Sequence, residues 1–490
     1  MKIAFDNEKY LKIQKEKIEE RIKMFDNKLY LEFGGKIFDD YNASRVLPGF
    51  NPNAKIKLLE EFKDDLEIIF CINASNIQKN KIRADYGISY EVELIRLIEN
   101  IQNLGISINS VVVTMYNGQP EVEKLRNTLN SKNIKVYLHG FTKGYPDNVD
   151  VIVSEEGYGK NPYIETTKKL VVVTAPGPNS GKLGTCLSQL YHEHKKGIKA
   201  GYAKFETFPV WDLPLMHPVN VSYEAATADL ADINMIDSFH LEEYNIKAVN
   251  YNRDISAFPI LKNILKKISG VDVYKSPTDM GVNTISKCIV DNEAAEEAAK
   301  QEIIRRYYAA LSDKVKGIGT DREIDIIKNL MNNVGITTEN RKIVKYALEK
   351  AEKEGTNALA IELENGKIIT GKESELLSAA SALLINTIKE LSGIPDDVYL
   401  LSPSVLESIF KIKKQTSYKR KYSLNLPEVL IALSICASTN PIIEKTLSSL
   451  EKLRGLEAHS SYVISLGEMQ VLKSFGINLT CEPKLLGYEV

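Results

Sequence analysis

Residues 170–191 read LVVVTAPGPNSGKLGTCLSQLY, and this stretch predicts a buried strand, a tight turn and a helix in succession. The strand is expected to end at Thr174 and the helix to begin near Lys182, because a β-branched run gives way to Gly, Pro, Asn and Ser. At such a junction, unpaired backbone N–H groups and the positive end of the helix dipole converge, and this favours a bound phosphate. The stretch therefore points to both a fold class and a candidate site.

The candidate phosphate-binding residues belong to the turn and to the first turn of the helix. They are Gly177, Asn179, Ser180, Gly181, Lys182 and Thr185. The backbone would cradle the phosphate, while the lysine adds a charge and the threonine a hydroxyl. The pattern departs from the standard loop G-x-x-x-x-G-K-[ST], because only three residues separate the two glycines and Leu183 follows the lysine. The alternative is an ordinary strand-to-helix turn in which glycine only permits tight packing.

Together with the strand of this stretch, at residues 169–175, further β-branched and apolar runs on its N-terminal side predict a sheet. These runs span residues 66–72, 110–116, 134–140 and 149–155. Amphipathic segments at 90–104 and 120–131 lie between them and read as helices. Continuous apolar strands that alternate with helices are typical of a mainly parallel sheet covered on both faces.

The chain has 490 residues, which is too long for one hydrophobic core. Residues 1–290 are expected to form an N-terminal α/β domain whose part 200–290 looks irregular. Residues 291–355 are rich in Ala, Glu and Lys and predict a helical connecting segment. Strand-like and helix-like patterns alternate again in residues 356–490, so this part predicts a separate C-terminal α/β domain with a three-layer arrangement.

Polar residues of the irregular region are candidates for substrate contacts and catalysis, because binding residues often lie on loops carried by a rigid sheet. The candidate substrate contacts are His217, Asn220, Arg253 and Asn283. Asp254 would act as a base or metal ligand, and Thr185 or Asp279 would help to hold Mg²⁺, so the two aspartates join Lys182 as candidate catalytic residues. Alternatively, these residues pack a loop-rich subdomain or cap helices.

Several function classes are not favoured. A formal charge of -2 gives no electrostatic reason to bind nucleic acid or an anionic membrane. No apolar run approaches the ~18 residues of a membrane span. Five scattered cysteines without a CxxC pair do not suggest a disulfide framework, so a cytoplasmic location is expected. His192 and His194 are two residues apart, whereas a zinc protease needs histidines at i and i+4, and no metal site is predicted.

Several long motifs in one order resemble a single bacterial family. They include YLEFGGKIFDDYNASRVLPGFNPNAKI (30–56), SPTDMGVN (276–283) and LRGLEAHSSYVISLGEMQVLKSFGINLTCEP (453–483). The family is the uncharacterised group known as domain of unknown function 1846. The resemblance implies a C-terminal domain similar in topology to cytidine deaminases, but no activity. The H-x-E and P-C-x-x-C ligands of a deaminase zinc site are absent from this part of the sequence.

The leading hypothesis is an enzyme that uses ATP, with Mg²⁺, or another phosphorylated small molecule for phosphoryl transfer or ligation. A second hypothesis is a non-catalytic sensor or assembly protein that binds a phosphorylated metabolite at the same turn. A third is a hydrolase or lyase that needs no nucleotide. A homo-oligomer is expected for an enzyme of this size, although no interface is visible in the pattern.

Overall fold

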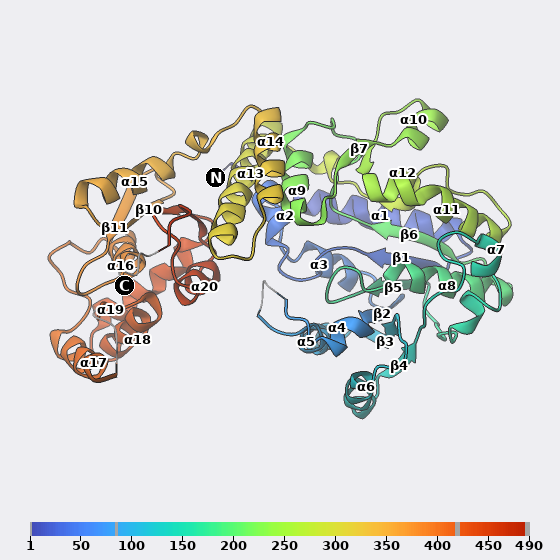
Figure 1. Cartoon of the computed structure of the whole chain (residues 1–490), viewed down its shortest axis with the longest axis horizontal. Helices are drawn as coiled ribbons and strands as arrows, with labels where there is room; N and C mark the ends of the chain where they lie inside the picture. Colours follow the sequence, from blue (N-terminus) through green and yellow to red (C-terminus); the bar gives the residue numbers. More distant parts are fainter. Residues whose placement is uncertain (1, 84–86, 417–421, 486–490) are drawn as a thin grey trace. The chain divides into compact units, whose positions relative to one another are not determined.

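The structure is a computed structural model that describes residues 2–83, 87–416 and 422–485 (Figure 1). The chain divides into two compact units, Lys2–Ala299 and Lys300–Val490. The division falls within α13 (Asn292–Val315), inside the segment that the sequence predicts as a helical connection. No helix of the described residues is sufficiently long and apolar to cross a membrane.

The N-terminal unit is built on a seven-stranded sheet in which every pairing is parallel. Its strands are β1 (Leu29–Phe33), β2 (Leu66–Asn73), β3 (Ser107–Thr114), β4 (Lys135–Leu138), β5 (Leu170–Thr174), β6 (Gly201–Phe205) and β9 (Gly281–Val282). Their order across the sheet is β4-β3-β2-β5-β1-β6-β9. The predicted α/β class with a mainly parallel sheet is therefore confirmed.

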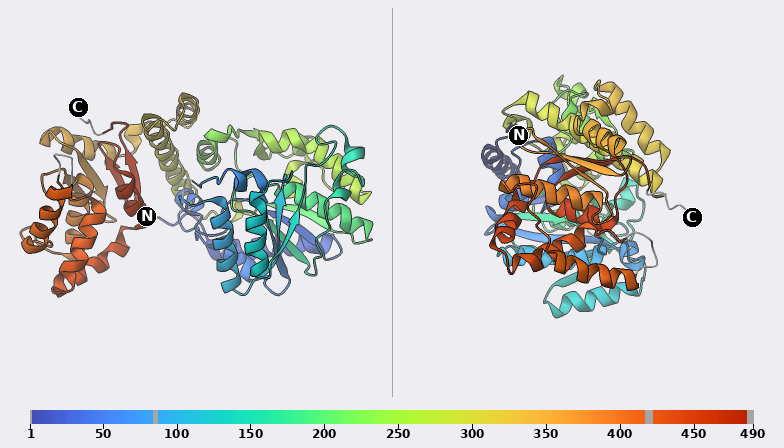
Figure 2. Two further views of the ribbon diagram at one scale, coloured as in Figure 1. Left: turned by 60° about the horizontal axis from the view of Figure 1, so that its bottom comes forward. Right: turned by 90° about the vertical axis from the view of Figure 1, so that its left-hand side faces the viewer.

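Helices cover both faces of this sheet (Figure 2). One face packs against α1 (Asn7–Met24), α2 (Tyr41–Val46), α3 (Ala54–Glu60), α4 (Ala74–Gln78), α5 (Tyr90–Asn103) and α6 (Glu121–Ser131). The other packs against α7 (Val149–Ile152), α8 (Lys182–Lys195) and α11 (Asn252–Ser269). Successive strand residues alternate between the two cores: Ile68 and Phe70 belong to the first, Ile69 and Cys71 to the second.

Two local expectations between residues 149 and 290 are wrong. The run 149–155 is not a strand but begins with the short helix α7, because the Asn148 side chain accepts a hydrogen bond from Val151 N and caps it. The region 200–290 is not irregular but contains β6, α9 (Pro218–Ala226), α10 (Ser238–Tyr244), α11, α12 (Pro277–Met280) and a hairpin of β7 (Asn234–Ile236) and β8 (Val249–Tyr251). Most helices and strands in this region are short, so the sequence shows no extended periodic pattern of apolar residues that would predict them.

The C-terminal unit is a separate α/β domain with a mixed four-stranded sheet, as predicted. The strands are β10 (Ala358–Glu362), β11 (Ile368–Lys372), β12 (Glu457–Ser460) and β13 (Asn478–Cys481), in the order β11-β10-β12-β13. β10 pairs antiparallel with β11 and β12, whereas β12 and β13 are parallel. Its helices include α15 (Ile343–Glu354), α16 (Ala379–Ser392), α17 (Pro403–Thr416), α18 (Leu426–Ala437), α19 (Pro441–Leu447) and α20 (Leu466–Ser474).

One buried arginine connects β12 to β13. Arg341 is 1% exposed, and its Nε donates to Thr480 Oγ1 at 2.9 Å. Its Nη2 donates to the carbonyls of Ala458 and Asn478 at 3.0 and 2.8 Å, while Nη1 pairs with the Glu457 carboxylate. Arg305 Nη1 reaches the other oxygen of Glu457 at 2.9 Å. The guanidinium thus satisfies groups on both strands in a place that water does not reach.

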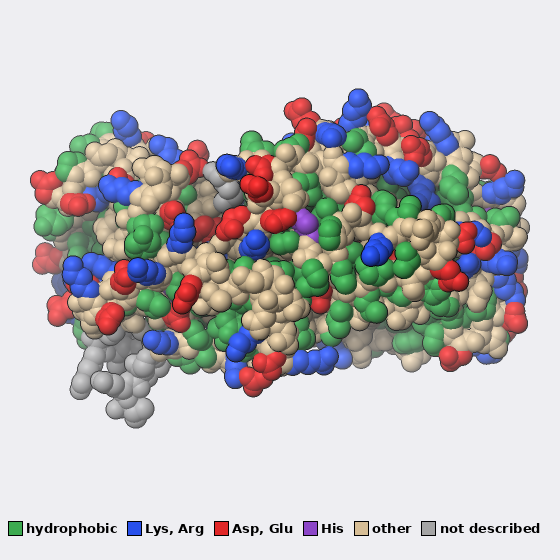
Figure 3. Space-filling view, turned by 90° about the horizontal axis from the view of Figure 1, so that it is seen from above, with side chains coloured by type: hydrophobic (Ala, Val, Ile, Leu, Met, Phe, Trp, Pro, Cys, Tyr) green, Lys and Arg blue, Asp and Glu red, His purple; other side chains and the backbone are tan. Residues whose placement is uncertain are grey.

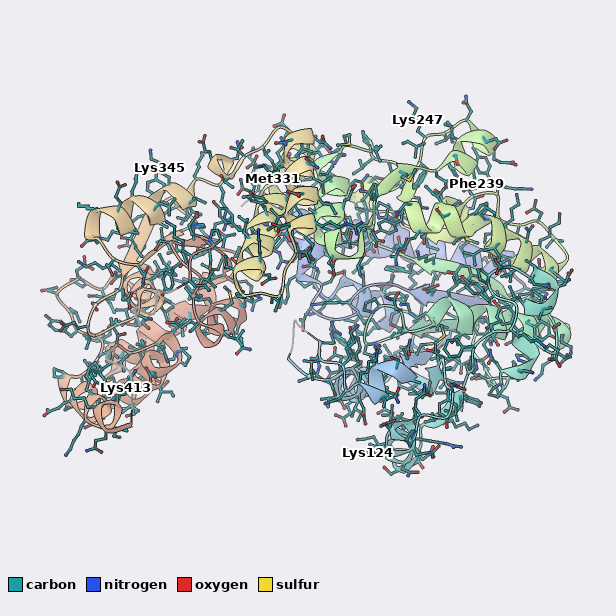
Figure 4. The ribbon with its side chains drawn as sticks, in the orientation of Figure 1. Lys124, Phe239, Lys247, Met331, Lys345 and Lys413 are labelled. Carbon is teal, nitrogen blue, oxygen red and sulfur yellow. The ribbon has the colours of Figure 1, made fainter. Side chains whose placement is uncertain are left out.

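Most charged side chains lie on the surface, unlike Arg341. In the face seen in Figure 3, Lys and Arg side chains are interspersed with Asp and Glu. The labelled lysines in Figure 4, such as Lys124 on α6 and Lys345 on α15, project outward from their helices. Exposed ion pairs contribute little to stability, so the few buried charges have the larger energetic consequences.

Candidate functional site

The candidate site lies where the chain leaves neighbouring strands β2 and β5 in opposite directions. After β2 the chain continues through α4 and α5 toward β3 on one face of the sheet. After β5 it continues through α8 on the other face toward β6. In open parallel sheets, this divergence leaves a crevice outside the carboxyl ends of the two strands, where ligands commonly bind. The turn between β5 and α8 borders this crevice.

The carbonyl groups of the turn are fixed to the sheet. Thr114 Oγ1, at the end of β3, donates to the carbonyl of Ser180 at 2.7 Å. Asn73 Nδ2, at the end of β2, donates to the carbonyl of Asn179 at 3.2 Å. Gly181 has a φ of +81°, and a Cβ there would lie 2.8 Å from the Thr114 side chain. Glycine is therefore required at 181, because any other residue would be strained and would collide with β3.

The N–H groups of the turn remain unused. Among the described residues, those of Gly177, Asn179, Ser180, Gly181 and Lys182 donate to no acceptor. α8 begins without a side-chain cap, so the N–H groups of its first turn add to them. Ser180 is 3% exposed, and its buried hydroxyl also has no partner. The turn thus combines unsatisfied donors with the positive end of a fourteen-residue helix.

A shallow pocket of about 410 Å³ opens beside this turn. It is lined by Asn73, Ser75, Met115, Gln119, Phe141, Asn179 and Gly181. These residues follow the carboxyl ends of β2, β3, β4 and β5, so four strands contribute to one pocket. Asn73 is held by a second hydrogen bond, because its Oδ1 accepts from Ser75 N at 2.8 Å. The pocket is large enough for a small organic ligand.

A second group of polar side chains lies at the carboxyl ends of β1 and β6. Lys204 Nζ contacts Glu206 Oε1 at 2.6 Å and Asp254 Oδ2 at 2.5 Å. Tyr202 donates its hydroxyl to Glu32 Oε2 at 2.7 Å. The group therefore contains three carboxylates around one ammonium, a set that we call the Lys204 cluster: Glu32, Lys204, Glu206 and Asp254.

The pKa values of two members of the Lys204 cluster, Lys204 and Glu206, are shifted from their ordinary values. Burial alone would lower the pKa of the Lys204 ammonium, but the carboxylates of Glu206, Asp254 and Glu32 raise it overall. Burial raises the pKa of Glu206 to about 7, because Lys204 only partly offsets it and Asp254 and Glu32 add to it. A carboxyl group with a pKa near neutrality is suited to both accepting and donating a proton at physiological pH.

The turn and the Lys204 cluster lie at the same edge of the sheet, because β5, β1 and β6 are successive neighbours in the strand order. Burial raises the pKa of Cys71 to about 12, and burial also raises the pKa of Cys186. Both pKa values are raised further by the negative charge of Glu32 and lowered by the positive charge of Lys182. The candidate site therefore comprises two groups of residues, the turn and the Lys204 cluster, at the carboxyl ends of the neighbouring strands β2, β5, β1 and β6.

Glu206→Gln should remove a pH dependence from the stability of the N-terminal unit. The folded state binds a proton at Glu206 up to about pH 7, whereas the ordinary pKa is 4.5. The unfolding free energy should therefore fall as pH rises from about 4.5 to 7, by about 3 kcal/mol in total. Glutamine resembles the neutral acid, so the variant should be more stable than wild type at pH 8 and similar at pH 4.5. Urea unfolding monitored by the single Trp, Trp211, measures this. Parallel pH profiles for both proteins would contradict the assignment.

The predicted residues outside the turn do not gather at one point. Asp254 lies in the Lys204 cluster, and its neighbour Arg253 points elsewhere, with Nε 2.7 Å from Asp232. Asp279 forms a capping box with Ser276 at the start of α12 and accepts from Tyr244. The Thr185 hydroxyl is buried and accepts from Cys71 Sγ at 3.4 Å, and so lies in the core and not in the pocket.

The remaining three predicted substrate residues have internal partners. His217 caps α9, and its Nε2 lies 3.1 Å from Asn292 Oδ1. Asn220 exchanges hydrogen bonds with the backbone of Val210. Asn283 donates to the carbonyls of Thr207 and Pro209. These amides and this imidazole thus hold the loop after β6 in place. No group of three or more His, Cys, Asp and Glu side chains within residues 2–83, 87–416 and 422–485 is arranged to hold a metal ion.

Sequence reasoning did not identify Glu32, Lys204 and Glu206. The signal was present, because Glu32 and Lys204 interrupt the buried strands LYLEF and GYAKF close to their carboxyl ends. A charged residue at that position in a parallel strand faces the edge where ligands bind. Phe141 and Met115 were also not identified, because single exposed apolar residues carry no sequence pattern.

Comparison with known proteins covers both units. The family model described as domain of unknown function DUF1846, N-terminal, matches residues 3–335, and its C-terminal counterpart matches residues 339–488. A UPF0371 protein of Clostridium botulinum (strain Alaska E43 / Type E3) is 53% identical over 492 residues, which cover 99% of this chain and 98% of the relative. A UPF0371 protein of Clostridium botulinum (strain ATCC 19397 / Type A) is 52% identical over 495 residues with the same coverage.

Proposed function

We propose that this chain, which belongs to the bacterial family described as domain of unknown function DUF1846, binds a phosphorylated small molecule at the turn 177–182 and transfers a group to or from it. The observation that carries the proposal is the set of backbone N–H groups at Gly177 and Asn179 to Lys182, which donate to no acceptor within residues 2–83, 87–416 and 422–485. Donors of this kind at a helix N-terminus favour an anion with several oxygen atoms.

ATP is the first candidate ligand, with phosphoryl transfer or ATP-dependent ligation as the reaction. The turn suits its phosphates, and Lys182, which forms no ion pair among the described residues, would add a positive charge. Mg²⁺ would accompany the nucleotide. Thr185 and Asp279 have internal partners, and so do the carboxylates of the Lys204 cluster, so phosphate oxygens and water would supply most ligands of this ion.

The Lys204 cluster would supply the acid–base chemistry of the reaction. Glu206 would take a proton from the attacking group of the second substrate, since the pKa of this carboxyl is about 7. Asp254 and Glu32 would orient that substrate, while Lys204 would hold Glu206 and Asp254 and the Tyr202 hydroxyl would hold Glu32. Positioning and charge neutralisation would then account for most of the rate enhancement, as is usual for phosphoryl transfer.

Thermal unfolding against a ligand panel tests the proposal. The panel contains ATP, ADP, inorganic tripolyphosphate and phosphorylated sugars, each with and without Mg²⁺. A ligand at ~100 times its Kd should stabilise the folded protein by about 2.7 kcal/mol. Lys182→Ala should weaken that ligand by about tenfold or more, because a charge-assisted hydrogen bond contributes about 1.5–3 kcal/mol. Lys199→Ala, which removes an exposed lysine beyond the end of α8, is the matched control.

The outcome also separates the three classes of function. A Mg²⁺-dependent shift with ATP, together with turnover of ATP, supports the transferase or ligase. Binding of a phosphorylated metabolite without turnover would favour a sensor or assembly protein instead. Product formation without nucleotide would favour a hydrolase or lyase. A panel without any shift, or a shift that Lys182→Ala does not change, would overturn the phosphate-binding assignment.

A further inference from the structure

Two apolar side chains face solvent beside the phosphate-binding turn. Phe141 is 70% exposed and Met115 is 37% exposed, and both line the pocket that Asn179 and Gly181 also line. Exposed apolar side chains that line one pocket are characteristic of ligand-binding sites. The pocket borders both the phosphate-binding turn and these two apolar side chains. A ligand that fills it would therefore carry a phosphate at one end and an apolar group at the other.

The segments that carry these two side chains are held in place. Met115 follows β3 directly with a φ of +54°. The next residue, Tyr116, donates its N–H to the carbonyl of His139 at 3.0 Å, and His139 N donates to the carbonyl of Val113 at 2.9 Å. His139 is itself buried. The loops after β3 and β4 are thus joined by backbone hydrogen bonds, so Phe141 and Met115 emerge from a fixed edge of the sheet.

A polar group is available at the side of the same pocket. The Oε1 atom of Gln119 accepts from Asn117 N at 2.8 Å, which fixes the amide. Its Nε2 atom donates to no acceptor in the part of the chain that the structure describes. It can therefore donate to a ring nitrogen or carbonyl oxygen of a ligand. A flat heteroaromatic ring has both the face that Phe141 and Met115 would contact and the edge that this amide would contact.

We propose that Phe141 and Met115 form a platform for the base of a nucleotide whose phosphates bind at the turn 177–182, with Gln119 at the edge of the base. This inference rests on the proposed function and narrows its ligand from phosphorylated small molecules in general to nucleotides. A sugar phosphate would leave Phe141 uncovered. The pocket borders the turn directly, because two of its lining residues, Asn179 and Gly181, belong to the turn.

Isothermal titration calorimetry with ATP and with inorganic tripolyphosphate tests the platform. The two probes carry the same phosphate chain, and only ATP carries a base. Phe141→Ala should weaken ATP binding by about tenfold or more, the usual effect of removing a ring stacked on a base, and should leave tripolyphosphate binding within about twofold. Phe141→Trp keeps a stacking surface and should retain ATP binding. Phe141 is exposed, so its replacement should not change the melting temperature, and this is checked first.

The two proposals fail in different ways in this experiment. In one outcome, tripolyphosphate binds as tightly as ATP, Lys182→Ala weakens its binding, and Phe141→Ala changes neither affinity. That result would overturn the platform and would still support the phosphate-binding turn. If neither probe binds, the phosphate-binding turn itself is overturned, and the nucleotide proposal with it. Weaker ATP binding in Phe141→Ala with unchanged tripolyphosphate binding supports both.

Discussion

Replacement of Arg341 by methionine is expected to lower the unfolding free energy of the C-terminal unit by about 3–5 kcal/mol, the cost of removing one partner from a buried ion pair. Methionine has a similar volume, so the loss comes from the unpaired groups that remain. Thr480 Oγ1 and the carbonyls of Ala458 and Asn478 would each lose one donor, and Arg305 would remain as the charged partner of Glu457 among the described residues. This loss is a large fraction of the stability of a typical domain.

Hydrogen exchange of the full chain would measure this effect where it arises. The amides of β12 and β13 should exchange faster by the factor that corresponds to the lost free energy, since Arg341 connects these two strands. Arg126→Ala is the matched control, because Arg126 forms only an exposed pair with Glu123. It should change stability by less than about 1 kcal/mol. Unchanged protection of β12 and β13 in Arg341→Met would show that the network contributes little.

Lys204→Met is expected to destabilise the N-terminal unit by about 3 kcal/mol at pH 8 and by less at pH 5. Lys204 is 23% exposed and is the ammonium that faces Glu206 and Asp254. Without it, the carboxylates of the cluster repel one another, so the pKa of Glu206 should rise further above its present value of about 7. A carboxyl whose pKa is raised in the folded state costs stability as pH increases, so the loss should grow with pH.

The measurement is urea unfolding of the variant at pH 5 and pH 8. Trp211 reports on this unit, because its indole N–H donates to the carbonyl of Asn283. Lys195→Met removes a lysine from an exposed pair with Glu155 and serves as the control. An equal loss at both pH values would mean that Lys204 acts through packing of its methylene groups, and the electrostatic description of the cluster would then be wrong.

The sheet and the turn could be predicted from the sequence because both depend on local patterns. Residues 68–72 and 170–173 are continuous apolar runs, and such runs are typical of strands buried on both faces. The family resemblance, based on several long motifs, is also confirmed. The run 149–155 is mostly apolar as well, but the Asn148 cap makes its first residues helical. A helix cap depends on a single side chain, so the spacing of apolar residues does not reveal it.

The sequence marks Glu32 and Lys204 one by one as charges in apolar strands, but their assembly into one cluster could not be predicted because it depends on the order of the strands. Glu32 and Lys204 are far apart in sequence and become neighbours only because β1 pairs with β6. Nothing in the amino-acid pattern specifies that pairing. Conversely, Asn220 and Asn283 resemble ligand-binding residues in sequence, yet the structure gives their amides backbone partners. In a segment of short helices and strands, polar side chains form hydrogen bonds to helix ends and loop backbone as readily as to ligands.

The position of β5 between β1 and β2 also constrains when the sheet can form during synthesis. β1 ends at Phe33, but its two neighbours, β5 and β6, begin only at Leu170 and Gly201. During synthesis on the ribosome, both edges of β1 therefore remain without their native partners while β2, β3 and β4 emerge. Unpaired edges of apolar strands are prone to wrong association, and distant pairings form slowly. Nascent chains that stop before residue 170 would lack the centre of the sheet and would be natural clients for chaperones.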